Sequence, residues 1–220
     1  MPLGAFIARI EHLHPAWLET ELRHSVIAFG GGVLFAAIAL VLVPEGMAKL
    51  STAASLATFG AGGLFFFAVD RVIEQRGGTG AQLLAMLLDF VPESLALGAL
   101  LATRQSVGLL LAGFIALQNF PEGFNAYREL MAAGQVRART VLVSFCILVA
   151  LGPLAATAGY VWLRDLHEPL GVVMLFAAGG IFYLIFEDIA PQAKLEYHWA
   201  PPLGAVAGFM LGMLGDALVG

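Results

Sequence analysis

Cysteine and charge are both scarce in this sequence of 220 residues. Its one cysteine, Cys146, excludes an intrachain disulfide and a thiolate cluster for a metal. Only 12% of the residues are charged, whereas a soluble domain usually has about 25%. The 11 Lys and Arg residues against 16 Asp and Glu residues give a net charge of −5, so no basic surface is available for a phosphate backbone. These shortages exclude a soluble enzyme, a disordered chain and a nucleic-acid-binding protein.

Long apolar runs make up most of the chain, which is 60% hydrophobic with a mean hydropathy of +0.86. A helix that crosses a membrane needs about 20 mostly apolar residues, and seven windows meet this requirement. They are 25–43, 52–69, 81–102, 107–127, 140–163, 169–186 and 201–219. The runs are continuously apolar and do not alternate as the strands of a β-barrel do. We therefore expect an all-α polytopic membrane bundle, with seven transmembrane helices in a single domain over residues 25–220.

The N-terminal residues 1–24 are not expected to cross the membrane. Their apolar stretch from Leu3 to Ile10 is short and contains Arg9, and charged and aromatic residues follow it, which favours an interfacial helix. With the N-terminus inside, eight Lys and Arg residues fall on inner segments and three on outer ones. Since positive residues favour the cytoplasmic side, we expect a cytoplasmic N-terminus and an outer C-terminus, in the cytoplasmic membrane of a bacterium.

Small residues repeat one helical turn apart in the last window, at Gly204, Gly208 and Gly212. Membrane helices approach one another closely along such faces. We expect tight packing within the bundle, and the same face also allows a homodimer.

Four charged residues lie inside the windows, and they are Asp89, Glu93, Glu122 and Asp216. Asp216 lies near a helix end, where it can reach water. The other three lie near the middle of the third and fourth spans, where a carboxylate costs about 2.5–3.5 kcal/mol. Such residues usually face the interior of a bundle and mark the path of an ion or a proton. The alternative is a protonated carboxylic acid that donates one hydrogen bond between helices.

A short motif occurs in both of these spans. The third span reads Asp89-Phe90-Val91-Pro92-Glu93-Ser94, and the fourth reads Gln118-Asn119-Phe120-Pro121-Glu122-Gly123. Each motif has an oxygen-bearing side chain at position i and a glutamate at i+4, which share one helix face. Each proline also leaves the carbonyl four residues earlier without its helical donor, although a simple kink is the other reading of a proline. If the two faces meet, four oxygen-bearing side chains converge between the helices.

The expected donors are all oxygen atoms, because no histidine lies inside any window. Carboxylate and amide oxygens suit Mg²⁺, Mn²⁺ and Fe²⁺, and zinc also accepts carboxylates. The spacing therefore predicts a pathway for a divalent metal ion or a proton, without an organic cofactor.

These residues resemble the paired metal-binding helices of the ZIP (Zrt/Irt-like) family of metal transporters. The most specific match is the Pro-Glu-Gly motif of the fourth span with its partner in the third. Weaker matches are Val43-Pro44-Glu45-Gly46, Phe176-Ala177-Ala178-Gly179-Gly180 and Glu187-Asp188-Ile189-Ala190-Pro191. The resemblance covers roughly residues 25–219. Members of that family typically have eight spans, so it implies that the seven spans correspond to the second through the eighth and that the first is missing.

The resemblance implies a divalent metal transporter for zinc, iron(II) or manganese, working as an elevator-type secondary carrier and not as an enzyme. It implies a metal site at Asp89, Glu93, Gln118, Glu122 and Asn119, with Glu187 and Asp188 near the cytosolic release path. An ordinary interfacial pair is an equal alternative for these last two acids.

The departures from the family pattern affect the expected number of metal sites and the kind of ion that they would prefer. The family usually has a histidine where this chain has Asp89, and an asparagine where it has Phe90. A glutamate often precedes the proline at the position that reads Gly152-Pro153 here. These changes imply one metal site rather than two, and a shift toward harder ions.

Two other functions stay open. A non-transporting metal-sensing or structural membrane subunit is favoured by the missing span and the lost histidine. An intramembrane metal-dependent hydrolase would need histidine ligands such as those of His-Glu-x-x-His, so it ranks last. The expected partners are the lipid bilayer, a divalent metal cation and a second copy of the chain.

Overall fold

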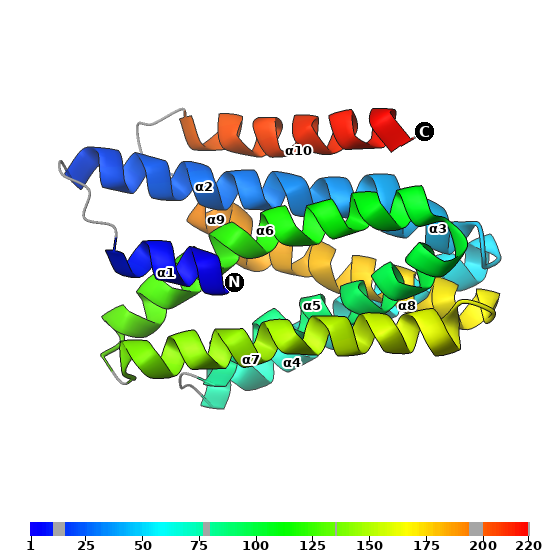
Figure 1. The fold of residues 1–220 in the computed structure, drawn as a ribbon, viewed down its shortest axis with the longest axis horizontal. Coiled ribbons are helices and arrows are strands. Elements are labelled where there is room, and N and C mark those ends of the chain that lie inside the picture. The colour runs from blue at the N-terminus through cyan, green and yellow to red at the C-terminus, as the bar shows by residue number, and fades with distance from the viewer. Residues whose placement is uncertain (11–15, 77–79, 135, 194–199, 220) are drawn as a thin grey trace.

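Helices account for nearly all of the chain that the structure describes. A computed structural model describes residues 1–10, 16–76, 80–134, 136–193 and 200–219, which contain no strand. The elements are α1 (Pro2–Ile10), α2 (Ala16–Ala36), η1 (Ala37–Leu42), α3 (Val43–Met47), α4 (Thr52–Arg76), α5 (Gly80–Thr103), α6 (Gln105–Ala132), α7 (Ala138–Ala158), η2 (Gly159–Leu163), α8 (His167–Leu184), η3 (Ile185–Ile189), α9 (Ala190–Gln192) and α10 (Ala200–Val219) (Figure 1). The three η segments are π-helical turns.

Seven helical stretches of the described chain are long and apolar enough to cross a membrane. They are Glu21–Met47, Thr52–Val72, Met86–Thr103, Gln105–Ala132, Ala138–Leu163, His167–Gln192 and Ala200–Val219. The all-α membrane bundle and its seven spans are therefore confirmed, with ends that shift by a few residues from the sequence windows.

Wide turns keep two of these spans continuous. The π-helical segment η1 precedes Pro44, and η3 precedes Pro191. Proline has no N–H, and its ring crowds the carbonyl four residues earlier. A wider local turn relieves this conflict without ending the helix.

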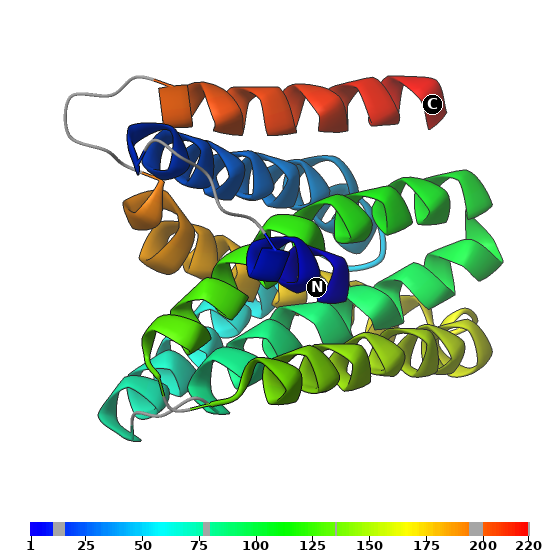
Figure 2. The same ribbon diagram turned by 60° about the vertical axis from the view of Figure 1, so that its left-hand side comes forward.

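The helices fall into two groups by their contacts, and α6 runs obliquely to α2 and α10 in Figures 1 and 2. In the α2–α8 group, α2 packs against α10 and α4 packs against α8, and α8 also contacts η1 and α3. In the α5–α6 group, α5 packs against α6 and α7, and α1 packs against α6. The two groups meet where α6 contacts α2 and where α5 contacts α8. The bundle has an Arg23 end, where α2 begins and α6 ends, and an Arg104 end, where α5 turns into α6.

The glycines of α10 pack against α2 of the same chain. A Cβ atom on Gly208 would overlap the carbonyl oxygen of Phe29, and one on Gly32 would overlap that of Ala205. This confirms the tight packing expected from the glycine repeat. Because α2 occupies that face, the face is not free to form a homodimer.

The N-terminal segment begins with the short helix α1, which packs against the bundle. Gly4 lies so close to α6 that a Cβ there would overlap the carbonyl oxygen of Phe120, and Ala5 is fully buried. Small residues let the two backbones approach, so a helix too short to span still buries one face against the bundle. Residues 16–24 belong to α2 and continue into the first span, whereas 11–15 lie outside the described residues.

Candidate metal centre

The two acidic motifs lie on neighbouring helices. Asp89 and Glu93 belong to α5, and Gln118 and Glu122 belong to α6, which packs against it. Pro92 and Pro121 lie inside these helices, and both helices continue past them. The chain turns back on itself between Thr103 and Gln105, so α5 and α6 form a hairpin of two long helices.

The motif side chains are buried to an extent that is unusual for acids and amides. Glu93 and Gln118 are fully buried, and 6% of the surface of Asp89 and of Asn119 is exposed. The Oε2 atom of Glu122 is also inaccessible to solvent. These polar groups therefore need partners from the protein, from bound water or from a ligand.

Contacts across the hairpin join the motifs in pairs. The Nε2 atom of Gln118 donates a hydrogen bond to Oε2 of Glu93 over 2.6 Å. The carboxyl groups of Asp89 and Glu122 lie within hydrogen-bonding reach of each other. Two carboxyl groups attract each other only when they share a proton or a cation. The expected convergence of four oxygen-bearing side chains is thus present between α5 and α6.

Four buried oxygen atoms at this site have no hydrogen-bond donor. They are Oε1 of Glu93, Oε1 of Gln118, Oδ1 of Asn119 and Oε2 of Glu122. Within the described chain, only one other buried side-chain N or O atom has no partner, the Oγ of Ser55. Buried oxygens without donors are rare in proteins, so their concentration at one place indicates that something else satisfies them. A cation or bound water is a group of the kind that can do so.

Asn119 contributes through the orientation of its amide. Its Nδ2 donates to the carbonyl oxygen of Ile115 on the same helix over 2.7 Å, which leaves Oδ1 as the free end. Asp89 uses one oxygen locally, since its Oδ1 accepts the backbone N–H of Phe90 over 2.7 Å.

The donor set is mixed. Among the described residues, no three His, Cys, Asp or Glu side chains gather closely enough to hold a metal ion by themselves. A divalent ion between the helices would therefore need the amide oxygens of Gln118 and Asn119 beside the carboxylates. Such all-oxygen ligation suits hard cations.

A cavity of about 90 Å³ extends from these carboxyls toward the Arg23 end of the bundle. Asp89 and Glu122 line one part of it, and Asn125, Asp188 and Gln192 line another. Asp188 therefore shares a cavity with the motif acids. Glu187 is exposed and does not line this cavity.

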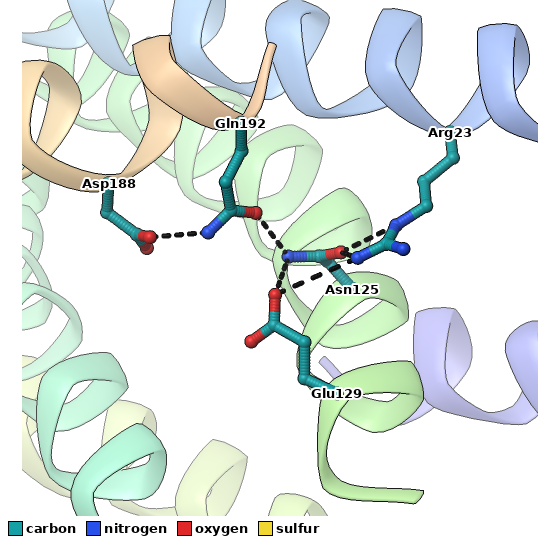
Figure 3. A network of polar contacts seen from close by, with 5 residues as sticks. All are labelled: Arg23, Asn125, Glu129, Asp188 and Gln192. Atoms are coloured by element: carbon teal, nitrogen blue, oxygen red, sulfur yellow. Dashed lines mark hydrogen bonds and ion pairs between the residues drawn. The ribbon is translucent and has the colours of Figure 1, made fainter. Parts of the chain in front are cut away.

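Apart from Asp188, the polar residues around Asn125 were not expected from the sequence. Figure 3 shows Arg23, Asn125, Glu129, Asp188 and Gln192 in one network. One signal was available, because Asn125 comes three residues after Glu122 and shares its helix face. The partners Arg23 and Gln192 are more than 60 residues away along the chain, so no local pattern links them to it.

The Arg104 end carries a second group of charges. Glu45 on α3 is buried, and it forms ion pairs with Arg104 and with Lys49, the latter over 3.5 Å. Arg104 lies in the turn between α5 and α6, so this contact ties the hairpin to the α2–α8 group.

No family model matches this chain, and no curated protein matches it. The chemistry of the site must therefore be argued from the chain's own residues.

Proposed function

We propose that this protein is a divalent metal transporter, and that the ion crosses the membrane through the site between α5 and α6. The observation that carries the proposal is the set of four buried oxygens without donors, on two proline-containing helices, where the carboxyl groups of Asp89 and Glu122 interact. A doubly charged cation compensates both the unpaired oxygens and the acidic charge. The likeness of the two motifs to those of the ZIP family supports the same conclusion.

The proposed cargo is a divalent ion that accepts oxygen ligands, namely manganese, iron(II) or zinc. Asp89, Glu93 and Glu122 give the site its negative charge, although no three acids of the described chain lie close enough to hold one ion together. Gln118 and Asn119 would supply the neutral oxygens that complete the ligand set. Asp188 takes part in release, because it lines the same cavity nearer the Arg23 end. Glu187, its exposed neighbour, would act at the mouth of that path.

The proposed mechanism is that of an elevator-type secondary carrier. The α5–α6 group holds the ion, and the α2–α8 group provides the frame against which it moves. The Arg23 end faces the cytoplasm, in keeping with the Lys and Arg distribution. Carboxylates bind a metal only when deprotonated, so uptake should decrease as the pH falls through the range in which these acids become protonated.

The site can be tested with Glu122→Gln in purified protein reconstituted into lipid vesicles. The substitution removes one ligand charge and keeps the side-chain shape, so Mn²⁺ uptake should fall by a factor of about ten or more, since one lost charged contact corresponds to about 1.5–3 kcal/mol. Asp216→Asn is the matched control, because it removes an exposed carboxylate from another span. Unchanged uptake by Glu122→Gln would reject the site.

Metal binding without transport would favour the alternative function. If the parent protein binds Mn²⁺ in a manner that depends on Glu122, yet vesicles take up none, the non-transporting sensor or structural subunit is the correct reading.

A further inference from the structure

The cavity beside the metal site has a polar network at its Arg23 end (Figure 3). Five side chains form it, and they come from both helix groups. They are Arg23 of α2, Asn125 and Glu129 of α6, Asp188 of η3 and Gln192 of α9. The network therefore connects α6, the helix that carries Glu122, to α2, η3 and α9.

Asn125 is the centre of this network. Its Oδ1 accepts two hydrogen bonds from Arg23, from Nε over 3.1 Å and from Nη2 over 2.8 Å. Its Nδ2 donates to Oε1 of Glu129 over 2.7 Å and to Oε1 of Gln192 over 2.9 Å. Gln192 in turn donates to Asp188. The amide of Asn125 thus uses both of its N–H groups and its oxygen, and only 8% of the residue is exposed.

The position of the network relative to the site is fixed by α6. Asn125 follows Glu122 by three residues, which is about 4.5 Å along a helix axis. Asn125, Asp188 and Gln192 line the same cavity as Asp89 and Glu122. These three side chains therefore lie beside the route that leads from the carboxyl groups toward the Arg23 end.

We propose that Asn125 is the central residue of a gate that closes this end of the cavity. The contacts from Arg23 through Asn125 to Gln192 hold α6 against α2 and α9. Separation of these elements requires Asn125 to release one of its partners. This inference rests on the proposed transport function for the identity of the cargo, but the gate itself is defined by protein contacts alone.

The charges of the network suit a passage for cations. The guanidinium of Arg23 would repel a divalent ion, but Asn125 and Glu129 engage it, the latter at 3.9 Å. When the gate opens, Asp188 loses the N–H of Gln192 and gains an oxygen that can accept the ion. Opening thereby creates a ligand on the exit side of the gate.

The gate can be tested by the rate at which a thiol behind it reacts. Ile27 lines the cavity and is 8% exposed, and it lies one turn after Arg23 on the same face of α2. In a Cys146→Ser background, Ile27→Cys supplies a single reporter, which is treated in lipid vesicles with a membrane-impermeant maleimide. Asn125→Asp removes both N–H donors of the Asn125 amide. Gln192→Met removes the hydrogen bonds that Gln192 of α9 makes with Asn125 and Asp188. In each variant the thiol at position 27 should react about fivefold faster than in the reporter protein that keeps Asn125 and Gln192, as expected for one lost hydrogen bond.

Gln105→Met is the matched control for Gln192→Met, because Gln105 is exposed at the opposite end of the bundle. It should leave the reaction rate unchanged. Equal rates in the reporter, Asn125→Asp and Gln192→Met would overturn the gate. If Asn125→Asp fails to fold, as judged by gel filtration, Gln192→Met decides the question by itself. The readout needs no metal, so a failure of the gate and a failure of the Glu122→Gln uptake test are separate results.

Discussion

At the scale of single residues, Gln118 is the side chain on which the candidate metal centre most depends. Glu93 is fully buried, and Gln118 is the side chain that donates a hydrogen bond to it. A buried carboxyl group without a donor is costly. Because the amide of Gln118 gives its N–H to Glu93, its own oxygen is left for a cation. One residue would thus stabilise one proposed metal ligand and supply another.

Gln118→Met should therefore destabilise the protein. It keeps the length of the side chain but leaves both oxygens of Glu93 without a donor, which should lower the free energy of unfolding by about 1–3 kcal/mol. Thermal unfolding in detergent measures this, with the exposed Gln105→Met as the control. If the two variants unfold at the same temperature, the hydrogen bond from Gln118 to Glu93 does not stabilise the protein.

At the scale of elements, backbone contact at glycines determines which helices are neighbours. The α10 helix packs against α2 through Gly208 and Gly32, where a Cβ atom would overlap a carbonyl oxygen of the facing helix. In a membrane, such close packing substitutes for the hydrophobic effect, which does not distinguish lipid from protein. The repeat of glycines in α10 is therefore an internal packing face.

The prediction for this face compares two glycines in spanning helices. Gly208→Ala should force α10 away from α2 and cost about 1–3 kcal/mol by overpacking. Gly113 has open space around its Cβ position, so Gly113→Ala should be neutral or slightly stabilising. Unfolding in detergent measures both, and equal stability of the two variants would contradict the packing role.

At the scale of the whole molecule, polar contacts join the two helix groups at both ends. Glu45 and Arg104 tie α3 to the α5–α6 turn, and the network around Asn125 ties α6 to α2 and α9. Movement of one group against the other must break contacts at an end. If the protein is the transporter proposed above, these few side chains would control access to the site from either side.

The orientation in the membrane is a prediction at this scale. Since eight Lys and Arg residues fall on one side and three on the other, the C-terminus should lie outside the cytoplasm. Alkaline phosphatase fused after residue 220 should be active, and a fluorescent protein fused there should stay dark. A bright fluorescent fusion with an inactive phosphatase fusion would place the C-terminus in the cytoplasm and the Arg23 end on the other side of the membrane.

The sequence alone determined the seven spans, the all-α class and the two polar residues that each motif places on one helix face. These properties are local, because apolar length defines a span and a spacing of four residues defines a shared face. Only the tertiary structure decided that α1 packs against α6, that Gln118 bonds Glu93, and that Arg23 meets Asn125 across 102 residues. These contacts depend on which helices become neighbours, and that choice follows from packing between distant segments, which no local pattern records.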